Sequence, residues 1–234
     1  MIKTREIKDI VFPGDKIETG QLKPRNGIQR GEESNCTSQY FGVVQKGEEF
    51  IDVVPFNGSY SPRRGDKIIG KVLDVGPSMW TIDMKSPYLV MLHMNDTPWK
   101  TYSGELRKFL VPGDYIFAKI MNLNEVKESW ITMKEPGIGL RKLEGGTIIS
   151  VPSPKVPRII GKNGAMINMV KDATSTRIII GQNGLIWIDG EPEHVQKAVE
   201  AIKIIEREAH TIGLTERMTQ FLKDNKGENH GNAQ

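Results

Sequence analysis

Short apolar runs bounded by Gly, Pro and Asn dominate the first part of the chain. Residues 1–60 contain three such runs, at 10–12, 40–44 and 50–54. Apolar runs this short, placed between turn-forming residues, are typical of strands rather than of helices, which need about ten residues or more. We therefore predict a small N-terminal β-domain over residues 1–60, with 55–62 as the linker to the next domain.

A second group of apolar runs fills residues 61–136. Five strands in about 70 residues is the size of an OB-type five-stranded barrel, which we predict here. The segment 95–110 is too long for a hairpin turn, so we expect a functional loop there. The candidate strands are 68–75, 80–84, 88–92, 115–120 and 129–133.

The pattern changes again over residues 145–222, where helical periods alternate with strands. The predicted order is βααββα, followed by a C-terminal helical extension, and the polar tail 223–234 is expected to be disordered. The fold class is therefore multi-domain, β plus α+β. The expected elements are a strand at 147–151, a short helix before residue 161, a helix at 165–172, strands at 177–180 and 185–188, and a helix from 191 with Val195, Val199, Ile202, Ile205 and Ala209 on one face.

A turn ending in Gly-Asp recurs three times before an apolar strand. Gly accepts positive φ, and the Asp carboxylate bonds to nearby backbone, so we predict that each copy is a turn that leads into a strand. The copies are Pro13-Gly14-Asp15, Arg64-Gly65-Asp66 and Pro112-Gly113-Asp114.

Positive and negative charges nearly balance over the whole chain, but they do not balance within each of its segments. The net charge is +3, whereas residues 141–177 alone hold seven basic and two acidic residues, which favours a phosphate-bearing partner there. The single Cys36 excludes an internal disulfide and a cysteine zinc site. No apolar run reaches the roughly 20 residues of a membrane span, and the charged start has no signal-peptide core. We expect a soluble cytoplasmic protein without a cofactor, a metal ion or a membrane partner.

The basic segment contains the loop Gly161-Lys162-Asn163-Gly164 between two predicted helices. A phosphodiester backbone can approach a peptide backbone closely only where no Cβ intrudes, and the N-terminus of the following helix favours phosphate. Lys162 and Arg158 add positive charge. We expect Ile159, Ile160 and Ile167 to form an apolar wall for bases beside the loop.

This region resembles a K-homology (KH) domain of type I. The stretch 156–167 matches the core of that family, whose Gly-x-x-Gly loop clamps about four nucleotides of single-stranded RNA backbone. The alternative is an ordinary helix–helix turn. A second match, Gly181-Gln182-Asn183-Gly184, lies between two predicted strands, where Asn-Gly favours a hairpin turn over a second RNA loop.

The preceding barrel resembles the OB-fold family named for ribosomal protein S-one, through residues 64–72 and 112–116. In that family strands two and three stack bases, and Trp80, Tyr88 and His93 lie nearest to those positions. The alternative for Trp80 and Tyr88 is the barrel core. The basic residues of the long loop are either phosphate contacts or simply solvated: Lys100, Arg107 and Lys108.

The order of the three domains resembles the KH-bearing cap subunits of the archaeal RNA exosome. The sequence segments that match are 10–15, 61–66, 155–158, 166–169 and 205–211. The resemblance implies that three caps sit on a hexameric ring of phosphorolytic ribonuclease subunits and feed single-stranded RNA into it. The N-terminal domain would dock on the ring, the barrels would line the entry pore, and the KH domains would lie outside.

No catalytic constellation stands out in this sequence. The four histidines are scattered without metal-ligand spacing, and no nucleophile–base motif is present. We therefore predict a non-catalytic RNA-binding protein. Two alternatives remain open from sequence: a free-standing single-stranded RNA binder in translation or transcription, and a ribonuclease that uses scattered carboxylates and a metal ion.

Overall fold

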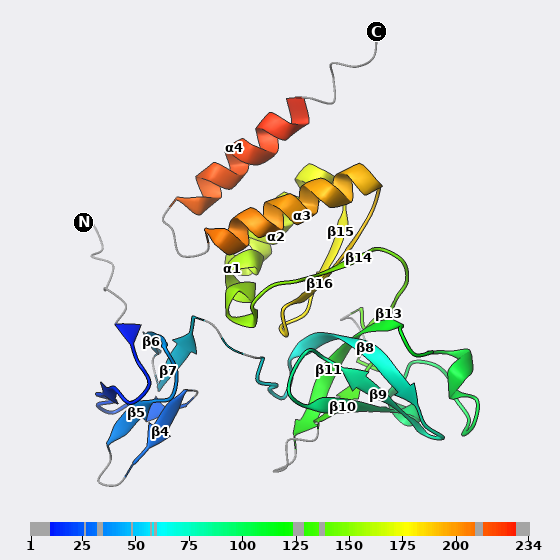
Figure 1. The fold of residues 1–234 in the computed structure, drawn as a ribbon, viewed down its shortest axis with the longest axis horizontal. Helices are drawn as coiled ribbons and strands as arrows, with labels where there is room; N and C mark the ends of the chain where they lie inside the picture. Colours follow the sequence, from blue (N-terminus) through cyan, green and yellow to red (C-terminus); the bar gives the residue numbers. More distant parts are fainter. Residues whose placement is uncertain are drawn as a thin grey trace. The chain divides into compact units, whose positions relative to one another are not determined.

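The computed structural model describes residues 10–25, 27–31, 35–47, 49–56, 58, 60–123, 129–135, 139–208 and 213–227. The chain divides into two compact units, residues 1–58 and 59–234 (Figure 1). The second unit holds both the predicted barrel and the predicted KH region. None of the helices in the described ranges has the length and apolar composition that a membrane crossing requires.

The first unit is built from two small sheets. One sheet has the strand order β1-β6-β7-β3, with bounds Ile10–Val11, Gly42–Lys46, Phe50–Pro55 and Lys23–Pro24. The other has the order β2-β5-β4, with bounds Lys16–Ile17, Cys36–Ser38 and Ile28–Arg30. The three predicted runs correspond to β1, β6 and β7. A small core of buried side chains holds the unit together: Val11, Ile17, Ile28, Cys36, Val44, Ile51 and Val53.

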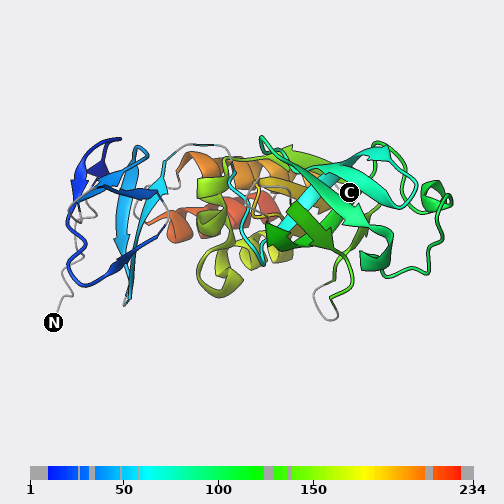
Figure 2. The same cartoon turned by 90° about the horizontal axis from the view of Figure 1, so that it is seen from below.

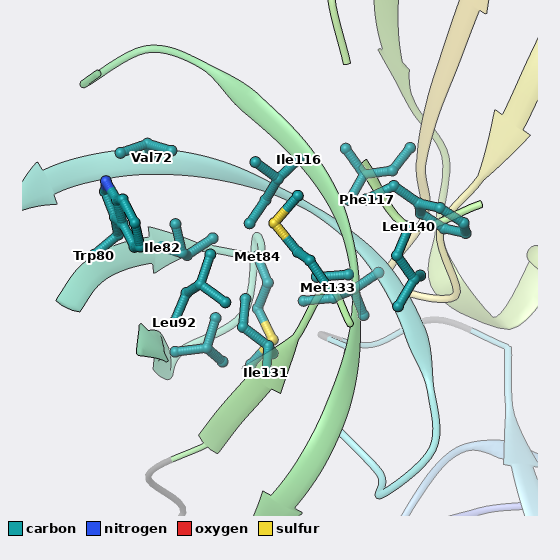
Figure 3. Packing of buried hydrophobic residues seen from close by; sticks show 14 of the residues in the cluster. Val72, Trp80, Ile82, Met84, Leu92, Ile116, Phe117, Ile131, Met133 and Leu140 are labelled. Atoms are coloured by element: carbon teal, nitrogen blue, oxygen red, sulfur yellow. The ribbon is translucent and has the colours of Figure 1, made fainter. Parts of the chain in front are cut away.

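The second unit begins with a closed five-stranded barrel, as predicted. The strands follow the order β12-β10-β9-β8-β11, and pairing of β11 with β12 closes the sheet. Figure 3 shows the apolar side chains that fill it, including Trp80, Ile82 and Leu92, none of which has exposed surface. The bounds are Lys67–Val75 for β8, Met79–Asp83 for β9, Leu89–His93 for β10, Tyr115–Leu123 for β11 and Ser129–Thr132 for β12, and β13 (Arg141–Leu143) pairs with β11.

The rest of the unit has the predicted βααββα order. Its antiparallel sheet runs β14-β16-β15, with bounds Thr147–Ser150, Leu185–Asp189 and Arg177–Ile180. Three helices pack against one another beside it: α1 (Val156–Ile160), α2 (Ala165–Thr174) and α3 (Pro192–Arg207). Ala209, predicted on the apolar face of the last helix, lies outside the described residues.

A fourth helix, α4 (Leu214–Gly227), extends this domain. It contacts α2 and α3, and α3 and α4 appear in orange and red in Figures 1 and 2. Leu214, Met218 and Leu222 are buried in the same core as α2 and α3. Helix α4 therefore continues past residue 223, where the sequence had predicted the start of the tail.

The three Gly-Asp turns have the expected geometry. Each glycine has positive φ: 93° at Gly14, 92° at Gly65 and 101° at Gly113. Each aspartate carboxylate accepts a hydrogen bond from the backbone N–H three residues earlier. These bonds run from Phe12 to Asp15 (2.8 Å), from Arg63 to Asp66 (3.2 Å) and from Val111 to Asp114 (2.9 Å).

Candidate nucleic-acid interface

The loop after α1 has backbone conformations with positive φ, which glycine adopts readily and most other residues adopt rarely. Gly161 ends α1 at φ 74° and ψ 177°, and its N–H donates to the carbonyl of Pro157 at 3.0 Å. Asn163 and Gly164 follow at φ 53° and φ 78°. A Cβ at Gly161 would lie 2.7 Å from the Cβ of Met166, so no other residue fits there. The loop therefore lies close against the first turn of α2.

The N-terminus of α2 faces this loop without a side-chain cap. Its N-cap residue is Gly164, so no side-chain oxygen accepts from the first N–H groups of the helix. Uncapped N–H groups and the positive end of the helix dipole together favour an anion. Within the described residues, the exposed Lys162 forms no ion pair, whereas nearby Lys155 pairs with Glu206 at 3.7 Å. Arg158 is exposed on α1. The predicted phosphate site thus combines backbone donors with an available cation.

The predicted apolar wall beside the loop needs correction. Ile159 has no exposed surface and Ile167 is only 6% exposed, because both face the core between α1, α2 and α3. Ile160 is half-buried and retains the most accessible surface of the three. Of the predicted wall, Ile160 therefore remains as a contact for a base.

Trp80 is a core residue rather than a stacking platform. It is 0% exposed, and its indole Nε1–H donates to the carbonyl of Leu110 at 3.2 Å. The alternation Trp80-Thr81-Ile82-Asp83-Met84 places Trp80 on the same buried face as Ile82 and Met84. The core interpretation that the sequence left open is the one the structure supports.

We expect Trp80→Phe to lower stability while leaving RNA affinity unchanged. The substitution removes the buried hydrogen bond to Leu110 and part of the ring volume, which costs about 1–2 kcal/mol. Urea denaturation and titration of a single-stranded RNA oligonucleotide would measure the two quantities. A loss of affinity without a loss of stability would restore the stacking role of Trp80.

Tyr88 immediately precedes strand β10, and His93 is the last residue of that strand. Tyr88 is half-buried against the barrel core. His93 is also half-buried, and its Nδ1 accepts a hydrogen bond from the backbone N–H of Asn95 at 3.2 Å. Five strand positions at about 3.3 Å per residue separate the two side chains by roughly 16 Å. They cannot contact the same base.

The long barrel loop is ordered by short 3-10 turns at Met94–Asp96 and Leu106–Lys108. Stacking of Trp99 on Phe109, with centroids 5.5 Å apart, holds its two halves together. Lys100 and Arg107 are exposed, and Lys108 pairs with Glu105 at 2.7 Å.

Tyr102 is a candidate contact that the sequence analysis missed. It is 69% exposed between Lys100 and Gly104, and the N–H of Gly104 donates to the carbonyl of Pro77 at 3.1 Å. The signal was its place in a polar loop, two positions after Lys100.

The second Gly-x-x-Gly is a hairpin turn between β15 and β16, as predicted. The N–H of Gly181 donates to the carbonyl of Leu185 at 2.8 Å, and that of Gly184 to the carbonyl of Gly181 at 3.0 Å.

These features define a KH-domain protein with an OB-type barrel, and residues 146–204 match the KH domain family. The chain is 59% identical over 234 residues to the exosome complex component Rrp4 of Thermoplasma acidophilum, covering all of this chain and 98% of the relative. The Rrp4 component of Pyrococcus furiosus is 42% identical over 219 residues, covering 92% of this chain and 83% of that one. A solved exosome complex RNA-binding protein, 32% identical, superposes with a TM-score of 0.64 over 74% of this chain and 99% of its own. The chain belongs to the Rrp4 family of exosome complex components.

Proposed function

We propose that this protein is a non-catalytic RNA-binding cap of the exosome. It captures single-stranded RNA and guides it into a phosphorolytic ribonuclease ring for 3′-to-5′ degradation and processing. The observation that carries the proposal is the Gly161–Gly164 loop, where a side-chain-free backbone, the uncapped start of α2 and Lys162 converge. Membership of the Rrp4 family favours this function over a free-standing RNA binder.

The barrel adds a second RNA contact to this site. Lys100 and Arg107 supply cations for phosphates, and the exposed ring of Tyr102 supplies a face on which a base can stack. Stacking of a base on an aromatic side chain contributes about 1–3 kcal/mol and tolerates any sequence. Such contacts suit a protein that handles many different RNAs.

The N-terminal unit supplies the docking surface for the ring. Three phenylalanines form a surface cluster: Phe41 stacks on Phe12 with centroids 4.9 Å apart and contacts Phe56 at 5.0 Å. Phe12 is 58% exposed and Phe41 is 45% exposed. Exposed aromatic clusters of this kind mark protein–protein interfaces. We propose that three copies of the protein dock in this way on one ring, and that the complex is cytoplasmic, in keeping with the free thiol of Cys36.

Catalysis is assigned to the ring rather than to this chain. Over the described ranges, no three His, Cys, Asp or Glu side chains gather in a way that could hold a metal ion. A metal-dependent ribonuclease is the competing proposal. Incubation of the purified protein alone with RNA, in the presence of Mg²⁺ or of phosphate, separates the two, since degradation would refute the cap assignment.

Addition of the protein to ring subunits should raise the rate of phosphorolysis, most for long single-stranded substrates. A cap accelerates the capture of RNA rather than the cleavage of its bonds, because it raises the local concentration of RNA and orients the strand toward the channel. Oligonucleotides too short to reach from the cap to the active site should gain least. Phosphate-dependent release of nucleoside diphosphates, measured across a length series, tests this expectation. Equal stimulation at all lengths would contradict the capture mechanism.

A further inference from the structure

The two glycines of the loop Gly161–Gly164 have different surroundings. A Cβ at Gly161 would lie 2.7 Å from the Cβ and 2.9 Å from the backbone N of Met166, so the packing of the protein itself requires glycine there. A Cβ at Gly164 would meet only Asn168 among the described residues, at 3.5 Å from Nδ2 and 4.0 Å from Cγ, apart from its chain neighbours and the backbone of its own helix. The Gly164 side of the loop is therefore open, and the carboxamide of Asn168 borders the opening.

The position of Asn168 in α2 explains why its side chain reaches the loop. Gly164 is the N-cap residue of α2, and Asn168 follows it four positions later. Side chains of a helix lean toward its N-terminus, so residues four apart lie one above the other on the same face. The carboxamide accordingly lies beside the uncapped N–H groups that favour a phosphate.

Asn168 has no evident task within the protein. Its side chain is exposed, it does not cap α2, and it makes no hydrogen bond to another described residue. Asparagine is also a poorer helix former than alanine, because its carboxamide competes for backbone hydrogen bonds. A polar residue that weakens its own helix and has no partner in the fold is a candidate for contact with a ligand.

The carboxamide matches a ribose 2′-hydroxyl better than it matches a phosphate. Phosphate oxygens only accept hydrogen bonds, and the N–H groups of the loop together with Lys162 already supply donors to them. A carboxamide both donates and accepts, as does a 2′-hydroxyl, which lies close to the phosphate in RNA and is missing from DNA.

We propose that Asn168 binds the 2′-hydroxyl of the nucleotide whose phosphate is held at Gly164, and that this contact lets the loop distinguish RNA from DNA. The inference rests on the proposed function, in which the loop holds RNA backbone. The phosphate contacts are common to both nucleic acids, so the hydrogen bonds of Asn168 supply the difference between them.

The test compares the full chain with its Asn168→Ala variant on a tetra-adenylate and on its deoxy counterpart, which match the length that the loop clamps. NMR titration followed through the amide signal of Gly164 restricts the measurement to binding at the loop. Wild type should bind the RNA about fivefold more tightly than the DNA, and Asn168→Ala should lose about fivefold on the RNA, the worth of one hydrogen bond. Affinity of the variant for the DNA should stay within about twofold of wild type, because the cycle of residue against hydroxyl isolates their contact. Thermal stability should not fall, since alanine suits an exposed helical position.

Gln196→Ala is the matched control, because it removes a carboxamide from an exposed position of α3. It should leave both affinities unchanged. An RNA-to-DNA ratio that Asn168→Ala does not alter would overturn the proposal, and so would an equal loss on both probes, which would assign the carboxamide to a phosphate or a base. Lys162→Glu separates this failure from a failure of the proposed function. It should weaken both probes alike, whereas a loop that binds neither probe, or that ignores Lys162→Glu, would refute the RNA site itself.

Discussion

Replacing Phe41 by Asp is expected to release the protein from the assembled exosome while leaving its RNA affinity unchanged. Phe41 is the central ring of the surface cluster, in contact with both Phe12 and Phe56. If this cluster is buried against a ring subunit, Asp removes an aromatic anchor and leaves a carboxylate without a partner in the interface. Truncation of such an anchor costs about 2–4 kcal/mol, and the buried charge adds to that loss. Co-elution with ring subunits in size-exclusion chromatography measures the effect.

Phe50→Asp is the matched control for this substitution. Phe50 lies in the same unit, is 37% exposed, and has Arg25 over its ring at 5.0 Å, but it does not belong to the cluster. It introduces the same charge into the same domain. Phe50→Asp should therefore co-elute with the ring as wild type does. If Phe41→Asp also co-elutes, the cluster does not contact the ring, and if both variants fail, the loss reflects the fold of the unit.

The larger elements of the fold were predictable because their apolar patterns are long and regular. The barrel strands and the βααββα order follow from alternation and helical period, which depend on the residues of each segment alone. The strands β3, β4 and β5 were not predicted, because two or three residues carry no measurable period. Strand pairing between distant segments, rather than local pattern, creates them.

The candidate site was predictable in its backbone but less so in its side chains. Gly161 and Gly164 were identified from a local motif, and their positive φ values follow from the same local geometry. Ile159 was assigned to the surface although it faces the core, since a five-residue helix is too short to show which side is buried. Trp80 could have been assigned correctly, because its alternation with Ile82 and Met84 already marked the buried face.

The two Gly-x-x-Gly turns show where sequence reasoning stops. Their neighbouring elements separated them correctly, one between helices and one between strands. The contacts of Asn183 could not be predicted from its neighbouring elements, because its hydrogen-bond partner Ile69 lies 114 positions earlier in the chain. Contacts of that sequence separation depend on how whole domains pack, and no local pattern encodes them.

Lys162→Glu should weaken single-stranded RNA binding by about tenfold at low salt, which corresponds to roughly 1.4 kcal/mol. The substitution removes a cation beside the phosphate site and places a carboxylate at the uncapped start of α2, where it repels the bound backbone. Lys162 is a better probe than Gly161, because it is exposed and a side chain at Gly161 would collide with Met166. The fold should therefore remain intact, as thermal denaturation would show.

Salt dependence separates a local contact from the general field of the protein. Lys203→Glu makes the same change of charge on the exposed face of α3, so both variants have the same net charge. A cation in contact with phosphate releases counterions on binding, and its loss should make the slope of log K against log salt shallower by about 0.7. We expect that change for Lys162→Glu and an unchanged slope, with affinity within twofold of wild type, for Lys203→Glu. Equal effects of the two substitutions would mean that RNA responds to overall charge and that the loop is not the binding site.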